Sequence, residues 1–330
     1  MINGKMLHVS ASPHARSRQT TQNIMMDVVI ALIPALIASA IIFGLRALLV
    51  TAVSVATCVV AEFVMRKILK RNNTIQDLSA VVTGMLLAFN VPSNIPLWMV
   101  MTGDIFAIVI IKQCFGGIGQ NFINPAIGGR IFMLLSYSTP MTSWPTPKQG
   151  FMTFDAVTSA TPLASGEFPS VTDMLLGLRG GSLGETCIIA LVLGFIYLLV
   201  RKVIRPIIPL TYIGTVAVVM FIAGLVKGEA VTFTVNQLLS GGLFLGAIFM
   251  ATDYTTSPIT TKGKYIFAIG CGLFTCLIRL FGSLPEGVSY SIALMNVLVP
   301  LIERFTTPKP FGTPKETKEE KKAKKEAAKA

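Results

Sequence analysis

Long apolar segments, separated by short polar connections, restrict what this chain can fold into. A helix that crosses the hydrocarbon core of a bilayer needs about 20 mostly apolar residues. Segments of that length, or shorter ones bordered by Pro, Gly, Asn or Asp, occupy 24–43, 47–65, 78–90, 97–111, 126–138, 186–200, 209–226, 241–252, 265–282 and 288–302. Only 13% of the residues are charged, against about 25% in soluble domains. The pattern predicts an all-α integral membrane protein with about ten transmembrane helices.

Three of these segments are short, and helix-breaking residues border each of them. Asn90–Pro92 ends the third segment, Asn124–Pro125 opens the fifth, and Thr252–Asp253 ends the eighth. Helix ends at membrane depth are tolerated only where protein or a polar cavity surrounds them. We therefore expect some helices to be short or broken and to lie beside a polar site.

The basic residues predict an orientation in the membrane. The formal net charge is +12, but most Lys and Arg residues flank apolar segments or lie in the tail 305–330, so we expect a lipid membrane and no nucleic acid as partner. Cytoplasmic connections are enriched in Lys and Arg. With both termini cytoplasmic, only Arg46, Lys148, Arg179 and Lys227 fall on the outer side. This topology makes 139–184 an extracytoplasmic loop.

The two halves of the chain have related sequences. GMLLAFNVPSNIP (84–96) is similar to GAIFMATDYTTSP (246–258). Five spans per half is an odd number, so the second half would enter the membrane upside down. Such inverted repeats place functional sites near the midplane between the halves. The predicted organisation begins with a cytoplasmic N-terminal segment (1–23) and a first transmembrane repeat (24–138). An extracytoplasmic loop (139–184) then leads to a second transmembrane repeat (185–304) and a Lys-rich cytoplasmic tail (305–330).

The polar stretch FDAVTSATPL (154–163) interrupts this apolar pattern. By composition it is a turn, because Asp, Ser and Thr side chains satisfy nearby backbone donors and Pro162 restricts Thr161 to extended geometry. Composition alone gives it no other role.

The same stretch resembles the flavinylation motif of a known family. Asp155, Ser159, Ala160 and Thr161 match the motif of the family formed by the D-type subunits of Rnf complexes and the B-type subunits of Na⁺-translocating NADH:quinone oxidoreductases. Ser159 stands where the commoner pattern has Gly. The pattern GxNxxNPAxxGR at 119–130 and the expected spans are also similar to that family. The resemblance implies that Thr161 carries FMN through a phosphoester and that the other three residues form the recognition sequence.

The resemblance also implies a function. The chain would be a membrane subunit of an Rnf-type ferredoxin:NAD⁺ oxidoreductase, not catalytic alone, that transfers electrons and contributes to Na⁺ or H⁺ translocation. Its partners would be the other Rnf subunits, both membrane and iron–sulfur ones, and a flavin transferase that attaches the FMN. The family further implies a noncovalent flavin such as riboflavin. The expected location is the inner membrane of a prokaryotic cell, with the flavin loop outside.

Polar residues inside or beside the spans are further candidates for a noncovalent flavin site or an ion pathway. Asn124 follows a glycine-rich connection that starts at Gly116, and that connection also suits tight packing or a helix break. Charges inside spans face the protein and have partners. Arg130 and Asp104 are such residues, and we expect them either to form an ion pair or to contact a cation or a flavin. We hypothesise that ions pass between the two halves near Asp104.

Other polar residues are expected to be structural. Asp27 and Glu62 lie near helix ends, where interfacial solvation is expected, and Arg279 is expected to extend toward the outer interface. The cysteines show no metal-ligand spacing, so no metal site is predicted. Those in apolar segments are expected to be packed and inert, and they are Cys58, Cys187, Cys271 and Cys276.

Alternative functions remain open from the sequence. A B-type subunit of a Na⁺-translocating NADH:quinone oxidoreductase has the same motif. A secondary transporter or channel without flavin also fits inverted repeats and broken helices. A scaffold that assembles other membrane subunits is a third interpretation. Covalent flavin distinguishes the redox subunit from the transporter, because a simple carrier has no need of it. The scaffold interpretation predicts that Thr161→Ala leaves the activity of the complex intact.

Overall fold

The fold was analysed in a computed structural model, which describes residues 19–145, 147, 158–159, 163, 168–282 and 286–308. Its described part is almost entirely helical. One antiparallel pairing of two-residue strands joins Trp144 to Ser159. The prediction of an all-α membrane protein is confirmed.

The first half contains five helical segments in the order that the sequence predicts. They are α1 (Thr21–Phe43), α2 (Leu45–Ile68), α3 (Ser79–Phe89, preceded by the 3-10 turn η1, Ile75–Asp77), α4 (Leu97–Ile105, continued by the π-helix η2, Phe106–Gln113) and α5 (Pro125–Ser136). The connection to the second half contains α6 (Ser138–Met141), β1 (Trp144–Pro145), β2 (Thr158–Ser159) and α8 (Val171–Leu176).

The second half repeats this arrangement with one addition. Its elements are α9 (Ile188–Val200), α10 (Ile207–Lys227), α11 (Ala230–Leu239), α12 (Leu243–Leu245, continued by the π-helix η3, Gly246–Met250), α13 (Thr261–Phe281) and α14 (Val288–Thr306). The sequence did not predict α11. By length and composition, α1, α2, α10, α13 and α14 can each cross a membrane, and α11 with α12–η3 forms a sixth candidate bent by 63°. The other predicted spans are shorter helices.

The predicted helix breaks are present. Helix α3 ends at Phe89, and η3 ends at Met250. Asn124 caps the start of α5, where its Oδ1 accepts hydrogen bonds from the backbone N–H of Ala126 (3.0 Å) and Ile127 (3.5 Å). Pro125 is at the first helical position, where its missing N–H is not needed. These residues explain why the chain turns inside the protein.

Equivalent helices in the two halves pack in equivalent ways. Helix α2 packs on α3 and on α4–η2, and α10 packs on η3 and on α13. Helix α5 packs on α4–η2, and α14 packs on α13. Across the halves, α1 contacts its counterpart α9, and α5 contacts its counterpart α14. This pattern is the one expected of two repeats related by a pseudo-two-fold axis.

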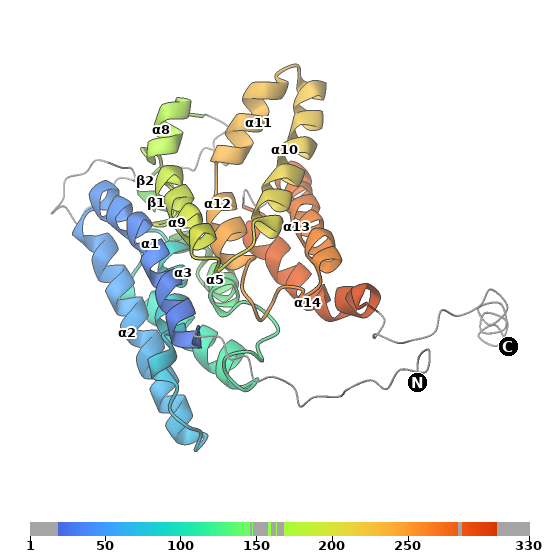
Figure 1. The fold of residues 1–330 in the computed structure, drawn as a ribbon. Helices are drawn as coiled ribbons and strands as arrows, with labels where there is room; N and C mark the ends of the chain where they lie inside the picture. The colour runs from blue at the N-terminus through green and yellow to red at the C-terminus, as the bar shows by residue number, and fades with distance from the viewer. Residues whose placement is uncertain are drawn as a thin grey trace, which may run out of the picture.

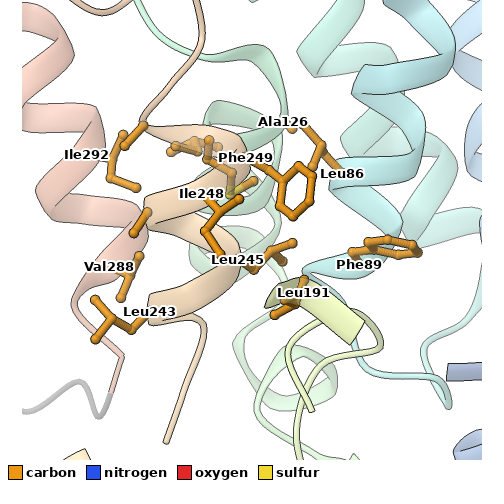
Figure 2. Close-up of a cluster of buried hydrophobic side chains, with 14 of the residues drawn as sticks. Leu86, Phe89, Ala126, Leu191, Leu243, Leu245, Ile248, Phe249, Val288 and Ile292 are labelled. Atoms are coloured by element: carbon orange, nitrogen blue, oxygen red, sulfur yellow. The ribbon is translucent and has the colours of Figure 1, made fainter. Parts of the chain in front are cut away.

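The core lies where the halves meet. Figure 2 shows Leu245, Ile248 and Phe249 of α12–η3 between Val288 of α14 and Phe89 of α3. All five side chains are buried. The short broken segment α12–η3 is thus surrounded by protein, which supplies the environment that broken helices require in a membrane.

The ends of the helices define two opposite faces of the molecule. In Figure 1 the start of α1 and the end of α14 lie in the lower half of the molecule, whereas α8 and α11 lie at its upper end. Helix α8, the part of the connection nearest α9, therefore lies opposite the start of α1.

Candidate functional site

A cavity of about 360 Å³ lies between the two halves. The first half contributes walls from α1, α3, η2, the connection 114–124 and the start of α5. The second half contributes walls from α9, from η3 and from the residues that follow each of them. Because Thr21 at the start of α1 lines it, the cavity is at the face opposite α8.

The cavity combines apolar walls with a few polar groups. Val28, Val82 and Phe249 are among its apolar lining residues, and Lys112 and Asp253 provide one charged group from each half. Ligand pockets of about 300–1,000 Å³ with this composition are typical sites for small molecules and cofactors.

Lys112 is held in place by buried partners. Its Nζ lies 2.8 Å from Glu62 Oε2 and 2.6 Å from Ser79 Oγ. The exposed fractions of the Lys112 and Glu62 side chains are 3% and 0%. Gln113 donates a further hydrogen bond to Glu62 Oε1 at 3.0 Å. The expectation that Glu62 is solvated at a helix end is therefore wrong, because Lys112 from η2 compensates its charge inside the protein.

Asp253 is held on the opposite wall by hydroxyl groups. Its Oδ2 accepts hydrogen bonds from Thr255 Oγ1 at 2.9 Å and from Thr256 Oγ1 at 3.1 Å. These contacts fix the turn that follows η3, so the acid keeps its place beside the cavity.

The sequence-predicted residue Asn124 lines this cavity. Besides capping α5, its Nδ2 donates a hydrogen bond to the carbonyl oxygen of Met250 at 3.3 Å. One asparagine therefore joins the start of α5 to the end of η3. The preceding connection needs glycine, since Gly119 also lines the cavity and has a φ of +90°, a conformation that other residues rarely adopt.

Arg130 does not pair with Asp104, so the expected ion pair is wrong. Arg130 forms an ion pair with Glu286. Its Nη1 donates to Asn90 Oδ1 at 2.7 Å and to Ser289 Oγ at 2.9 Å. Arg130 therefore connects α3 and α5 of the first half to the start of α14. It does not line the cavity.

Asp104 lies inside the first half and not between the halves, where an ion path was expected. It is fully buried on α4. Its Oδ1 accepts hydrogen bonds from Ser54 Oγ at 2.7 Å and Cys58 Sγ at 3.3 Å, both on α2. Its packing against α2 separates it from the cavity and from Arg130.

Two further expectations about charged residues are wrong. Asp27 is not solvated: it is 7% exposed and accepts hydrogen bonds from Tyr197 Oη (3.0 Å) and Arg201 Nε (3.1 Å). Arg279 does not extend to the interface. It donates to the carbonyl oxygens of Gln237 (2.6 Å) and Ser240 (3.1 Å) where the chain breaks between α11 and α12. Burial of Cys58, Cys271 and Cys276 agrees with their expected packing role, whereas Cys187 is half-buried.

The flavinylation motif falls largely outside the described residues. Asp155, Ala160 and Thr161 are among the residues that the structure leaves undescribed, and of Ser159 only the backbone pairing in β2 is described. Leu163, two positions after Thr161, is described. A methyl group built on Gly241 would lie 2.9 Å from Leu163 Cδ1 and 2.9 Å from Arg279 Nη2.

Sequence reasoning missed a second buried polar cluster, which surrounds Arg130. It contains Glu185 and Arg179 from the connection before α9, and Glu286 from the connection before α14. Glu185 and Arg179 are 2% and 3% exposed. The pKa of Glu185 is raised to about 8, chiefly because burial removes its hydration and also because Glu286 lies beside it. No residue spacing in the sequence brings these positions together.

The fold and the site thus define a polytopic α-helical membrane protein with a cavity of about 360 Å³ between its two halves. The sequence profile of the NQR2, RnfD, RnfE family matches residues 8–312. The chain belongs to this family, and the predicted resemblance is confirmed.

The relatives include three D-type subunits of bacterial complexes. That of the Na⁺-translocating ferredoxin:NAD⁺ oxidoreductase complex of Acetobacterium woodii is 48% identical, over 97% of this chain and 100% of the relative. That of the proton-translocating ferredoxin:NAD⁺ oxidoreductase complex of Clostridium ljungdahlii is 42% identical, over 94% and 98%. That of the ion-translocating oxidoreductase complex of Escherichia coli K12 is 32% identical, over 93% and 99%.

Proposed function

We propose that this chain is the D-type subunit of an Rnf-type ferredoxin:NAD⁺ oxidoreductase, carries FMN on Thr161 and binds a second flavin in the cavity between its halves. The observation that carries the proposal is that cavity, which the family's asparagine and glycine pattern helps to line. The subunit works with other membrane and iron–sulfur subunits in a prokaryotic cell membrane. Both termini face the cytoplasm, and a flavin transferase modifies Thr161 on the outer side.

The residues that line the cavity fit a noncovalent flavin such as riboflavin. The volume of about 360 Å³ lies within the range of cofactor pockets. Aliphatic and aromatic side chains suit the flat ring system, and Gly119 leaves open space next to the backbone because no atom lies within 4 Å of a built Cβ. Thr21, Asn121 and Thr255 add polar groups for a sugar-like chain.

Side chains at the cavity would hold and tune such a group. A bound flavin supplies one- and two-electron chemistry, and the protein supplies position and charge. Lys112, held by Glu62 and Ser79, places a hydrogen-bond donor at the cavity wall, where it can bind an acceptor atom of the ring. Asp253, fixed by Thr255 and Thr256, orients donors on the opposite wall. Asn124 keeps η3 and α5 together, so both walls hold their spacing.

The two flavin positions would serve opposite faces. The motif lies in the connection 139–184, and α8 of this connection lies opposite the start of α1 (Figure 1). A phosphoester tether keeps the outer flavin at a high effective concentration near its redox partners. The relatives named above translocate Na⁺ or protons, and we propose that this chain contributes to translocation of one of these ions.

A filled cavity tests this proposal. Val82 is half-buried at the cavity wall, so Val82→Phe narrows the cavity without removing a polar group. We expect the purified protein to release about one flavin per chain on acid denaturation, the stoichiometry of a single site. In Val82→Phe this released flavin falls at least tenfold, while flavin bound covalently is retained.

The matched control is Val218→Phe, because the Val218 side chain is 61% exposed on α10. This variant should release as much flavin as the natural protein. Equal release from Val82→Phe and the natural protein would place the noncovalent flavin elsewhere. No released flavin from either would contradict the second cofactor.

A further inference from the structure

The cluster that surrounds Arg130 contains two carboxyl groups in direct contact. The side chains of Glu185 and Glu286 lie within hydrogen-bonding distance of each other. A methyl group built on Gly242 would lie 3.3 Å from Glu185 Oε2 and 3.4 Å from Glu286 Oε1. Two ionised carboxylates are acceptors only, so a hydrogen bond between them requires a proton on one.

The partners of each carboxyl group decide which one carries that proton. Glu286 has donors for both oxygens: Arg130 pairs with Oε2, and the backbone N–H of Gly242 donates to Oε1 at 2.9 Å. Glu185 accepts from the neutral hydroxyl of Ser182, 2.6 Å from its Oε2. Arg179 Nη2 donates to the backbone carbonyl oxygen of Glu185 at 3.2 Å, and not to its carboxyl group. Glu286 is therefore the ionised member and Glu185 the protonated one.

The other charged groups around the pair come from each element packed against it. Arg179 lies on the connection before α9, Arg130 on α5, and Arg279 at the end of α13, where backbone carbonyls of the α11–α12 break engage it. Tyr290 on α14 lies near Arg130. The Nε of Arg179 has no hydrogen-bond partner among the residues that the structure describes, and Arg179 is only 3% exposed. A buried N–H donor is therefore free close to the two carboxyl groups.

We propose that Glu185 and Glu286 form a proton-binding site at the junction of the two halves, which holds one proton on Glu185 and exchanges it through Glu286. Glu185 is 2% exposed, whereas the Glu286 side chain is 16% exposed. A proton leaving the Glu185 hydroxyl passes to the Glu286 carboxylate and then to water, and the reverse order reloads the site. Each cycle of this site binds and releases one proton and transfers no electron.

The location links this site to the extracytoplasmic loop. Glu185 and Arg179 lie in the segment that connects α8 to α9. A Cβ on Gly241 would lie 2.9 Å from Leu163, 2.9 Å from Arg279 and 3.6 Å from Glu286, so Leu163 lies beside this cluster. The site therefore lies where the connection from α8 enters α9, and Arg130 on α5 ties it to the first half. The proposal does not rest on the presence of flavin.

Infrared spectroscopy of the purified full-length protein tests the site, because a protonated carboxyl group has its own carbonyl band. The infrared spectrum of Glu185→Gln is subtracted from that of the natural protein, both recorded at about pH 6, so that only the Glu185 carboxyl group contributes. A glutamate in water is ionised at this pH. We expect a protonated carboxyl band that disappears as the pH rises through about 8, as the raised pKa of Glu185 requires. The control Glu229→Gln removes an exposed glutamate and should leave no such band.

A second variant separates proton sharing from a merely structural carboxyl group. Glu286→Gln removes the neighbouring negative charge that raises the pKa of Glu185. The Glu185 band should then disappear at a lower pH, by about one unit or more, which is a tenfold or greater shift in proton affinity. Size-exclusion chromatography identifies any variant that does not fold, and Glu185→Asp, which keeps the acid, should retain a protonated carboxyl band that disappears as the pH rises. No Glu185-dependent band at about pH 6, or a transition unmoved by Glu286→Gln, would overturn the proposal.

Discussion

The buried pair of Lys112 and Glu62 couples the cavity wall to the stability of the first half. Their side chains are almost fully buried, and Nζ lies 2.8 Å from Oε2. Removing one partner of such a pair leaves an uncompensated charge and costs about 3–5 kcal/mol. We therefore expect Glu62→Gln to lower the thermal unfolding midpoint strongly. The double variant Glu62→Gln with Lys112→Met should recover most of the loss.

The matched control for this prediction is Glu229→Gln, an exposed glutamate on the turn between α10 and α11. Its midpoint should stay near that of the natural protein, since exposed charges contribute at most about 1 kcal/mol. If the loss of stability in the double variant equals the sum of the losses in Glu62→Gln and Lys112→Met, the two side chains do not stabilise each other.

At the residue scale, the sequence predicted caps and turns better than partners. Asn124 was found because Asn-Pro is a local signal for a helix start. The partner of Arg130 was missed because Glu286 lies 156 positions further along the chain and belongs to the other half. Glu62 was assigned to solvent because it lies near the end of α2, and nothing local shows that η2 delivers Lys112 to it. Burial of a charge is a tertiary property.

At the scale of elements, close packing of α1 on α9 joins the two halves. Gly194 on α9 allows this approach, because a Cβ there would lie 2.3 Å from the backbone oxygen of Ala31 and 3.0 Å from Phe249 Cζ. Backbone cannot move aside as a side chain can. We expect Gly194→Ala to destabilise the protein by about 1–3 kcal/mol, as overpacking does, and to lower its thermal midpoint.

Gly214→Ala on α10 is the control, since no atom lies within 4 Å of its built Cβ. Alanine favours helix over glycine by up to about 1 kcal/mol, so this variant should be as stable as the natural protein or more so. Equal effects of the two substitutions would mean that α1 and α9 are not tightly packed in the membrane.

Element positions followed from the sequence because membrane helices need continuous apolar segments. All ten predicted segments coincide with helices, including the short ones with breaks at Asn90, Asn124 and Thr252. Helix α11 was not predicted, because AVTFTVNQLL mixes β-branched and polar residues and is short. The π-helical stretches η2 and η3 were also not predicted, since they depend on packing and leave no composition signal.

On the scale of the whole molecule, each polar site is assembled from both halves. The cavity takes Lys112 from the first half and Asp253 from the second, and the proton site takes Arg130 from the first and both glutamates from the second. A chain built this way can bring electron carriers and a proton-binding group into the same rigid body, which suits a subunit of an ion-translocating oxidoreductase.

The central claim is that Thr161 carries covalent flavin, and in-gel fluorescence tests it most directly. The chain is expressed with a flavin transferase, denatured in SDS and viewed under ultraviolet light beside Thr161→Ala and the control Thr153→Ala, which lies outside the motif. We expect a fluorescent band in the natural chain and in Thr153→Ala and none in Thr161→Ala. A transferase that labels another substrate but leaves this chain dark, or a band that persists in Thr161→Ala, would contradict a flavin on Thr161. A dark chain would favour the transporter interpretation.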